Sequence, residues 1–450
     1  MDSKELREKY LKFFEDRGHK RIKPSPLVLV SDPTTLFTSS GMQQLVRNLM
    51  GEPHSGGLRL VDSQPCLRAH GLSDDVSKVG NSRSTSFFEM LGNWSLGDYF
   101  KKEQITWFWE FLTKELNLNP EKLHVTIFEG EAGVPKDEET FHIWGQVGVP
   151  EERIHFYKEN WWSRAGTSDQ MPIGEIGGPD SEVFFEFDIE HDPSFGEKCG
   201  PECECGKFLE IGNSVFMQYK MTQQGLKELP NKNVDFGGGL ERLTAATMNN
   251  PDIFMTDIFV KIIAEVERLT GKSYDKPENQ KQIRIIADHI KASVFIIKEG
   301  VVPGNKEQGY VLRKLIRRLS LKIRTLKGRL NETGQFGSLI AAVRQTYDGI
   351  YLEDVDFKRV NEVIEEEVAR FAKNLEKGLR EVEKINEINA KVAFDLYQSL
   401  GFPLEITQEL FEQKGQIIDK NELKKEFEEH QKLSRQQSSK MFKKSLGTHN

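Results

Sequence analysis

Two separate segments carry side chains that could bind a nucleotide. The first holds Arg68 and, after a loop, the sequence Ser-Phe-Phe-Glu-Met-Leu-Gly-Asn at residues 86–93. If these parts form a hairpin, the arginine can neutralise a phosphate while an aromatic ring of the second strand stacks on a base. The same residues also suit a surface ion pair above a core strand, so this segment alone does not decide the function.

The second segment is Val-Asp-Phe-Gly-Gly-Gly-Leu-Glu-Arg at residues 234–242. Three glycines between a predicted strand and a predicted helix let a ligand approach the backbone closely. Arg242, near the start of that helix, adds a positive charge where phosphate binding is favoured. A glycine-rich turn selected for steric reasons is the alternative. Because this segment occurs together with the Arg68 segment, we favour nucleotide binding.

A short loop contains three of the four cysteines and one histidine: His191, Cys199, Cys203 and Cys205. This spacing is typical of a tetrahedral zinc site. We hypothesise a closed structural zinc site that ties down the loop between predicted strands at 183–189 and 208–219. Reduced surface thiols are the alternative, and Cys66 is expected to be a core residue.

The charge distribution is uneven, although the net charge is −8 and the pI is about 5.8. Residues 308–330 hold eight basic and no acidic side chains. Four of the basic residues follow a helical spacing: Arg313, Lys314, Arg317 and Arg318. Such a stripe suits a phosphate backbone, although an ordinary solvated helix face has the same appearance.

The remaining pattern predicts an α+β fold. A helix is expected at 4–17, and another at 104–116 among short β-rich runs, which indicates a mainly antiparallel sheet flanked by helices. The runs are 27–30, 87–90, 124–128, 183–189 and 208–219. After about residue 250 the spacing becomes helical, at 253–269, 281–298, 310–326 and 355–388. We expect residues 1–250 to form the sheet domain and residues 251–450 an all-helical domain.

The longest predicted helix, 355–388, is either packed on its neighbours or an extended coiled coil. No basic start with an apolar segment opens the chain, and no apolar run is long enough for a membrane span. With few cysteines as well, we expect a cytoplasmic protein of more than one domain without membrane contact.

Several motifs in chain order carry a family resemblance. They are residues 32–37 with Gly41 and Met42, residues 87–93 with residues 97–100, residues 215–219 and residues 309–313. The series resembles the alanyl-tRNA synthetases from residue 5 to about residue 445. The resemblance implies a class II catalytic domain that activates L-alanine with ATP and Mg²⁺. Alanine is then transferred to the terminal adenosine of tRNA(Ala).

The resemblance also implies roles for single residues. The catalytic pair would be Arg68, which binds the α-phosphate and the carboxylate, and Arg242, the second nucleotide-binding arginine. One of Phe87 and Phe88 would face adenine. The full set expected at ATP is Arg68, Phe87, Phe88, Met90, Trp162, Gly239 and Arg242. Asn213 and Asp235 would hold alanine, because a carboxylate suits its ammonium group.

For tRNA binding, Asn305 matches the residue with which the family recognises the G·U pair of the acceptor stem. Gln398 stands where the family usually has a carboxylate. These two residues would act with the basic stripe Arg313, Lys314, Arg317 and Arg318. Longer relatives continue into an editing domain and a dimerising tail, so we expect this chain to be a monomer without editing. It is then either a piece of a longer protein or a natural short enzyme, and serine is expected to be activated measurably.

Several positions depart from the family pattern. The residues Ser84-Thr85-Ser86 replace His-His-Thr, and Leu72 replaces a lysine. Gly212 replaces a tryptophan, which should enlarge the amino-acid pocket unless Trp161 fills the space. Two rival functions stay open: an aminoacyl-adenylate ligase with an acceptor other than tRNA, and a noncatalytic RNA-binding protein.

Overall fold

The computed structural model describes residues 1–29, 35–69, 75–131, 133–328, 330, 335–400, 404–412, 414–419, 422 and 425–426. Residues 32–34 of the first motif, Leu72, Arg329, residues 401–403 and the last residues of the chain lie outside the described residues.

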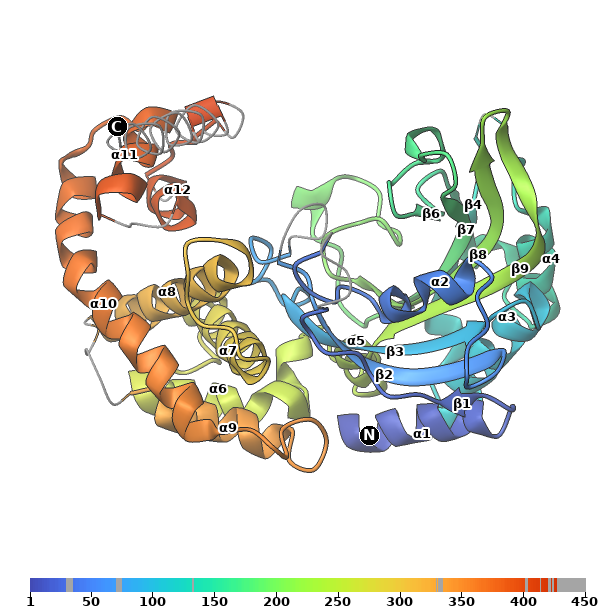
Figure 1. Cartoon of the computed structure of the whole chain (residues 1–450), viewed down its shortest axis with the longest axis horizontal. Coiled ribbons are helices and arrows are strands. Elements are labelled where there is room, and N and C mark those ends of the chain that lie inside the picture. Colours follow the sequence, from blue (N-terminus) through green and yellow to red (C-terminus); the bar gives the residue numbers. More distant parts are fainter. Residues whose placement is uncertain are drawn as a thin grey trace, which may run out of the picture.

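One sheet of nine strands forms the first part of the molecule (Figure 1). The strands are β1 (Lys20–Arg21), β2 (Arg59–Leu67), β3 (Phe87–Ser95), β4 (Leu123–Phe128), β5 (Ile154–Tyr157), β6 (Trp161–Ser163), β7 (Ile176–Glu186), β8 (Phe208–Thr222) and β9 (Gly225–Gly239). Their order is β1-β2-β3-β9-β8-β7-β4-β5, and β6 pairs with β7. Only the outer pairs β1–β2 and β4–β5 are parallel. The predicted antiparallel sheet is confirmed, but residues 27–29 of the expected run 27–30 form no strand.

Helices cover one face of this sheet. Helix α1 (Ser3–Glu15) begins at Asp2, whose side chain accepts a hydrogen bond from the backbone N–H of Glu5. Its Tyr10 ring packs on Phe111 and Phe236, with centroids 5.2 and 6.1 Å away. Also present are α3 (Lys101–Glu110), which continues as a π-helical turn (Phe111–Glu115), and α4 (Glu138–Gln146). The apolar side chains of α1, which recur with helical periodicity, thus face the core.

The other face is more open. A short 3-10 helix (Gly41–Leu45) and α2 (Val46–Leu49) lie over one part of it. Met42 and Leu49 belong to a small apolar cluster with Trp94 of β3 and Val215 of β8. Near the end of β9, α5 (Leu240–Thr247) begins directly after the glycines. Helix α5 itself packs on α1 of the first face, and a cavity lies near its start.

The second part is helical, as predicted. It contains α6 (Asp257–Thr270), α7 (Pro277–Lys298), α8 (Glu307–Lys327), α9 (Gly337–Thr346), α10 (Phe357–Lys384), α11 (Ala390–Leu400) and α12 (Leu404–Glu412). Helix α10 packs on α7, α8 and α9, which favours a packed helix over an extended coiled coil. None of the helices in the described ranges is long and apolar enough to cross a membrane.

The two parts share one hydrophobic core. A single cluster contains Tyr10 of α1, Phe236 of β9, Ile290 of α7 and Leu315 of α8. Phe87 of β3 packs on Phe295 of α7, with ring centroids 4.3 Å apart. A division at residue 250 stays a prediction, although every strand of the described residues ends before it.

Candidate active site

A cavity of about 290 Å³ lies on the open face, where β2, β3 and β9 end near α5. Its lining includes five of the residues predicted to bind ATP: Arg68, Phe88, Met90, Gly239 and Arg242. The loop before β3 contributes Asp75, Lys78, Arg83, Ser84 and Thr85. The two segments singled out in the sequence are thus brought together in one pocket.

Strand alternation decides between the two phenylalanines. Cys66 pairs with Phe88 and Gln64 with Met90, so Phe88 and Met90 share the face of Arg68. The Arg68 guanidinium lies 5.0 Å from the centroid of the Phe88 ring. Phe87 has no exposed surface and packs on the helical part. The aromatic side chain in the pocket is therefore Phe88, and the assignment of Phe87 to ATP does not fit its position.

Arg242 is fixed by a residue that the sequence reasoning missed. Its Nη1 donates to a carboxylate oxygen of Glu210 at 2.7 Å and to the backbone oxygen of Glu210 at 3.1 Å. Gly239, the residue before α5, pairs with Met90 across β3 and β9. A Cβ at Gly237 would lie 2.9 Å from the Met90 sulfur, so the glycine lets the methionine side chain lie against the backbone of β9. The arginine and the methionine are both held by their neighbours.

Three carboxylates lie close together beside this arginine: Asp180, Glu182 and Glu210. Burial raises the pKa of Asp180 to about 7. Burial, with the charges of Glu210 and Asp180, raises the pKa of Glu182 well above its usual value. Alternate residues of one strand face the same way, so the spacing of Asp180 and Glu182 could have revealed this acidic face. Such oxygen ligands suit a divalent cation, notably Mg²⁺.

Asn213 and Asp235 come together across β8 and β9. Val215 pairs with Asp235, and Asn213 pairs with Gly237. The indole N–H of Trp94 donates to Oδ1 of Asp235 at 2.7 Å. Burial raises the pKa of Asp235 to about 7, and the hydrogen bond from Trp94 opposes this shift. Oδ1 of Asn213 is buried without a hydrogen-bond partner among the described residues. The pair therefore offers acceptors to a cation.

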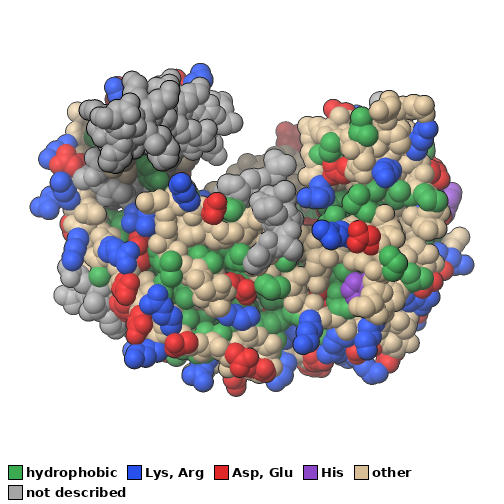
Figure 2. Space-filling model, in the orientation of Figure 1, with side chains coloured by type: hydrophobic (Ala, Val, Ile, Leu, Met, Phe, Trp, Pro, Cys, Tyr) green, Lys and Arg blue, Asp and Glu red, His purple; other side chains and the backbone are tan. Residues whose placement is uncertain are grey.

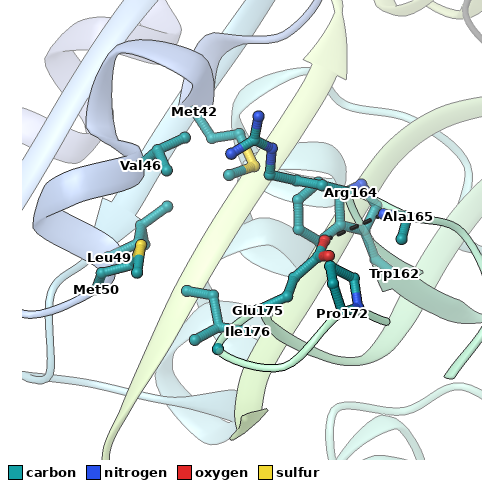
Figure 3. Close-up of a pocket in the computed structure, with 11 residues that line it drawn as sticks. Met42, Val46, Leu49, Met50, Trp162, Arg164, Ala165, Pro172, Glu175 and Ile176 are labelled. Atoms are coloured by element: carbon teal, nitrogen blue, oxygen red, sulfur yellow. Dashed lines mark hydrogen bonds between the residues drawn. The ribbon is translucent and has the colours of Figure 1, made fainter. Parts of the chain in front are cut away.

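Trp162 lies apart from the ATP group. It lines a second cavity of about 450 Å³ with Met42, Val46 and Ile176, between α2 and the segment that leads into β7 (Figure 3). Trp162 was predicted to bind ATP, but it lines this second cavity and not the one that contains Arg68 and Arg242. Trp162 instead contacts the apolar cluster of Trp94 and Val215, on the side of Asp235.

The basic stripe of α8 is only partly on the surface. Nε of Arg317 donates to the buried Glu367 of α10 at 2.7 Å. Arg318 is 7% exposed, and it donates to the backbone oxygen of Val76 at 2.7 Å. A phosphate contact by Arg318 therefore does not fit, because its guanidinium is used inside the protein. On the face drawn in Figure 2, basic and acidic side chains are intermixed.

Asn305 is exposed just before α8, and Arg313 donates a hydrogen bond to its Oδ1. Gln398 is exposed on α11. A Cβ at Gly309 would lie 2.7 Å from the backbone oxygen of Val302, so glycine is needed where the loop before α8 meets the helix. Asn305 is thus placed by a tight loop and by one arginine.

The comparisons with known proteins agree with this geometry. A family model described as tRNA synthetases class II (A) matches residues 5–449. The chain belongs to this family. An alanine–tRNA ligase of Borrelia hermsii is 40% identical over 98% of this chain and 74% of its own length. One of Treponema denticola is 41% identical over 99% and 74%, and one of Thermotoga maritima is 42% identical over 97% and 49%. A solved apo histidyl-tRNA synthetase of S. aureus aligns with 54% of this chain and 65% of its own at 12% identity, with a TM-score of 0.34.

Membership of the class II tRNA synthetases confirms the fold class predicted from the sequence, an antiparallel sheet flanked by helices. The predicted effect of Gly212 is wrong. A Cβ there would lie 2.6 Å from Phe108 and 2.9 Å from Phe236, on the face opposite to Asn213. Trp161 packs on Phe128 instead, with ring centroids 5.5 Å apart. The glycine does not enlarge the amino-acid pocket of this synthetase.

The cysteine loop of this synthetase has the geometry of a metal site. The ligand atoms of His191, Cys199, Cys203 and Cys205 all lie within 4.8 Å of one another. The sulfurs of Cys199 and Cys205 are 3.8 Å apart, and that of Cys203 is 3.7 Å from Nδ1 of His191. Tetrahedral zinc–sulfur bonds of about 2.3 Å give a sulfur–sulfur distance of about 3.8 Å. Nε2 of His191 lies 2.8 Å from the Gly196 oxygen, which suits a ring that binds a metal through Nδ1.

The same loop touches the nucleotide pocket. Nη2 of Arg83, a residue of the pocket lining, donates to the backbone oxygen of Glu204 at 2.6 Å. Glu204 lies between Cys203 and Cys205. The loop conformation that the four ligands would fix therefore supports a side chain of the cavity lining.

Proposed function

We propose that the chain is an alanine–tRNA ligase. It activates L-alanine with ATP to the adenylate and transfers alanine to the 3′-terminal adenosine of tRNA(Ala), whose acceptor-stem G·U pair it recognises. The observation that carries the proposal is the single sheet face on which Arg68 and Arg242 adjoin Asn213 and Asp235. The relatives named alanine–tRNA ligase, about 40% identical over nearly the whole chain, support it.

The activation step needs no protein nucleophile. The alanine carboxylate attacks the α-phosphorus of ATP, the acyl phosphate bond forms, and pyrophosphate leaves. Arg68 neutralises charge that develops on the α-phosphate, while Phe88 holds the adenine ring. Arg242, at the start of α5, adds a second cation for the phosphates. Positioning and fixed charge therefore supply the catalysis.

A magnesium ion fits the carboxylates next to the pocket. Glu210 and Glu182 offer oxygen ligands, and their charges are close enough for Glu210 to raise the pKa of Glu182. A bound magnesium ion spreads the negative charge of the phosphates. Glu210 also orients Arg242, so it would link a bound cation and the arginine.

The amino-acid subsite holds alanine by its ammonium group. Asp235, when ionised, accepts from the ammonium, and the unpartnered Oδ1 of Asn213 is a second acceptor. Trp94 holds the Asp235 carboxylate in place. The acid form of Asp235 would not serve, so alanine binding should depend on pH near neutrality.

The helical part would bind the acceptor stem. Because Arg313 occupies the carbonyl oxygen of Asn305, the amide NH₂ of Asn305 is the end that meets the G·U pair. Gln398, Arg313, Lys314 and Arg317 would contribute further polar contacts. In this proposal residues 1–250 are the catalytic domain and residues 251–450 the recognition domain.

A structural zinc ion in the Cys3His loop completes the proposal, with the geometry described above. The substrates are tRNA(Ala), L-alanine and ATP, and the proposed location is the cytoplasm. A monomeric state stays a prediction that sedimentation equilibrium would check.

The proposal is tested by alanine-dependent exchange of pyrophosphate into ATP. Wild type should catalyse the exchange with alanine, and Arg68→Ala should lose it by at least about a hundredfold. Arg268→Ala is the control, because Arg268 is an exposed arginine of α6 paired with Glu265. Absence of exchange in wild type would leave a noncatalytic RNA-binding protein. Exchange without any charging of tRNA would instead indicate a ligase with another acceptor.

A further inference from the structure

A buried line of polar side chains joins the helical part to the start of β3. Asp288 and His289 of α7 have no exposed surface. Asp288 accepts from the backbone N–H of Ser86 at 2.9 Å and from its hydroxyl at 2.5 Å. His289 Nδ1 lies 2.8 Å from Asp288, and His289 Nε2 lies 2.9 Å from Nη1 of Arg318. Charged groups buried this deeply are costly unless each has a partner, which these have.

The donors and acceptors of this line have one consistent assignment. A guanidinium can only donate, so Nε2 of His289 must accept from Arg318. The imidazole is then neutral, and its proton sits on Nδ1 and is donated to Asp288. Burial accordingly lowers the pKa of His289 to about 4. The line is therefore a fixed bridge in the neutral range and does not act as a proton switch.

The far end of the bridge holds a segment of the nucleotide pocket. Arg318 donates to the backbone oxygen of Val76 at 2.7 Å and to that of Val79 at 3.5 Å. Between and beside these residues, Asp75 and Lys78 line the nucleotide cavity. The backbone N–H of Asp75 also donates to the Arg68 oxygen at 3.0 Å. The Arg318 guanidinium thus holds the 75–79 segment, which is hydrogen-bonded to Arg68, by two backbone oxygens.

The near end holds the start of β3, the strand that carries Phe88, whose ring is the proposed partner of adenine. Ser86, bound by Asp288, also accepts from the backbone N–H of Arg68 at 2.9 Å through its carbonyl. Phe88, two residues later, lies in the pocket. Both sides of the nucleotide pocket are therefore tied to α7 and α8 through the same three side chains.

We propose that Asp288, His289 and Arg318 are positioning residues of the nucleotide site, which fix the 75–79 segment and the start of β3 so that Arg68 and Phe88 meet ATP in one geometry. The proposal rests on the proposed function, since ATP is taken as the ligand of the pocket. It gives the helical part a role in the activation step, before any RNA binds. None of the three side chains lines the cavity, so they act through the backbone that they hold.

The test uses Arg318→Met, which keeps most of the side-chain volume but removes every donor. In alanine-dependent pyrophosphate exchange, the KM for ATP should rise roughly tenfold, because small displacements of binding groups have large effects. The KM for alanine should rise less than that for ATP, because the ammonium group of alanine binds to Asn213 and Asp235, which do not contact the bridge, and only its carboxylate meets Arg68. Arg318→Lys, which keeps the charge and one donor site, should restore part of the affinity for ATP.

Two controls separate positioning from simple loss of stability. Arg324→Met makes the same change on the same helix, where Arg324 pairs with Glu376 of α10 at 2.7 Å. Leu319→Ala removes a fully buried apolar side chain beside Arg318 and lowers the melting temperature. Both should keep the wild-type KM for ATP.

An unchanged KM for ATP in Arg318→Met, or an equal rise for ATP and alanine, would overturn the bridge while the proposed function stands. No exchange in wild type would instead remove the proposed function itself.

Discussion

The indole N–H of Trp94 and the Oδ1 of Asp235 are 2.7 Å apart, and this hydrogen bond joins β3 to β9 at the proposed amino-acid subsite. Trp94 is fully buried and lies against Gly41 and Gly92, where a Cβ would meet its ring at 2.9 and 2.3 Å. The close packing on both glycines therefore holds the tryptophan beside the carboxylate. It favours the ionised form of Asp235, which burial disfavours.

Alanine binding should depend on pH through Asp235. The pKa of Asp235 is raised to about 7, so protonation removes the partner of the ammonium group as the pH falls below that value. The KM for alanine should thus fall as the pH rises from 6 to 8 and level off above about 8. Trp94→Phe removes the hydrogen bond that opposes the shift and should move this midpoint to higher pH. The KM for alanine in pyrophosphate exchange measures both. A flat profile in wild type would contradict the role of Asp235.

The position of Asn305 should depend on Gly309. In Gly309→Ala, the new Cβ would meet the Val302 oxygen at 2.7 Å and the Gly304 nitrogen at 2.9 Å, so the loop before α8 must shift. We expect the KM for tRNA in charging to rise roughly tenfold with pyrophosphate exchange unchanged. Gly304→Ala is the matched control, because its Cβ would come no closer than 3.6 Å to its neighbours. Equal effects of the two substitutions on charging would argue against this role of the loop.

The elements of the fold were predictable where a regular pattern and a buried face coincide. The 4–17 helix and the long 355–388 helix are found with small shifts, as Ser3–Glu15 and Phe357–Lys384. The segment 27–29 is apolar, yet it pairs with no strand. Its backbone accepts from Thr38 instead, through the Leu27 oxygen. Whether such an apolar segment becomes a strand depends on its tertiary partners, which the local sequence does not specify.

The zinc proposal predicts one zinc ion per chain in protein purified without chelator. Cys203→Ser should lose the zinc ion, lower the melting temperature and weaken ATP binding, because Arg83 rests on the Glu204 oxygen of the same loop. Metal analysis, thermal melting and exchange kinetics measure these effects. Cys66→Ala should keep the zinc, since Cys66 is a buried core residue. Wild-type protein without zinc would exclude the site.

Gly212 should matter for stability and not for selectivity. Gly212→Ala pushes a Cβ against Phe108 and Phe236, and overpacking of this kind costs about 1–3 kcal/mol of the free energy of unfolding. Serine should support measurable exchange in wild type, because one added hydroxyl is hard to reject. The ratio of serine to alanine exchange should be the same in Gly212→Ala. A changed ratio would show that position 212 faces the amino acid after all.

The charged and glycine-rich parts of the site were predictable from the sequence. The residues that position them were less predictable. Arg68 and Arg242 stand in recognisable motifs, and the cavity unites them. No sequence motif pointed to Glu210, which orients Arg242, because the two residues are 32 positions apart in the chain. Arg318 looked like a surface cation in a helical stripe, yet it faces His289. Whether a polar side chain points inward depends on distant partners that spacing does not specify.

The most direct test of the whole account is charging of tRNA(Ala) transcripts with labelled alanine, with and without the acceptor-stem G·U pair. Wild type should charge the G·U transcript, and Arg68→Ala should charge neither transcript. Charging should decrease strongly in Asn305→Ala or when the G·U pair is replaced by G·C. Equal charging of both transcripts by wild type would contradict recognition through Asn305. Alanine-dependent pyrophosphate exchange with no charging of either transcript would contradict the assignment of tRNA as the acceptor.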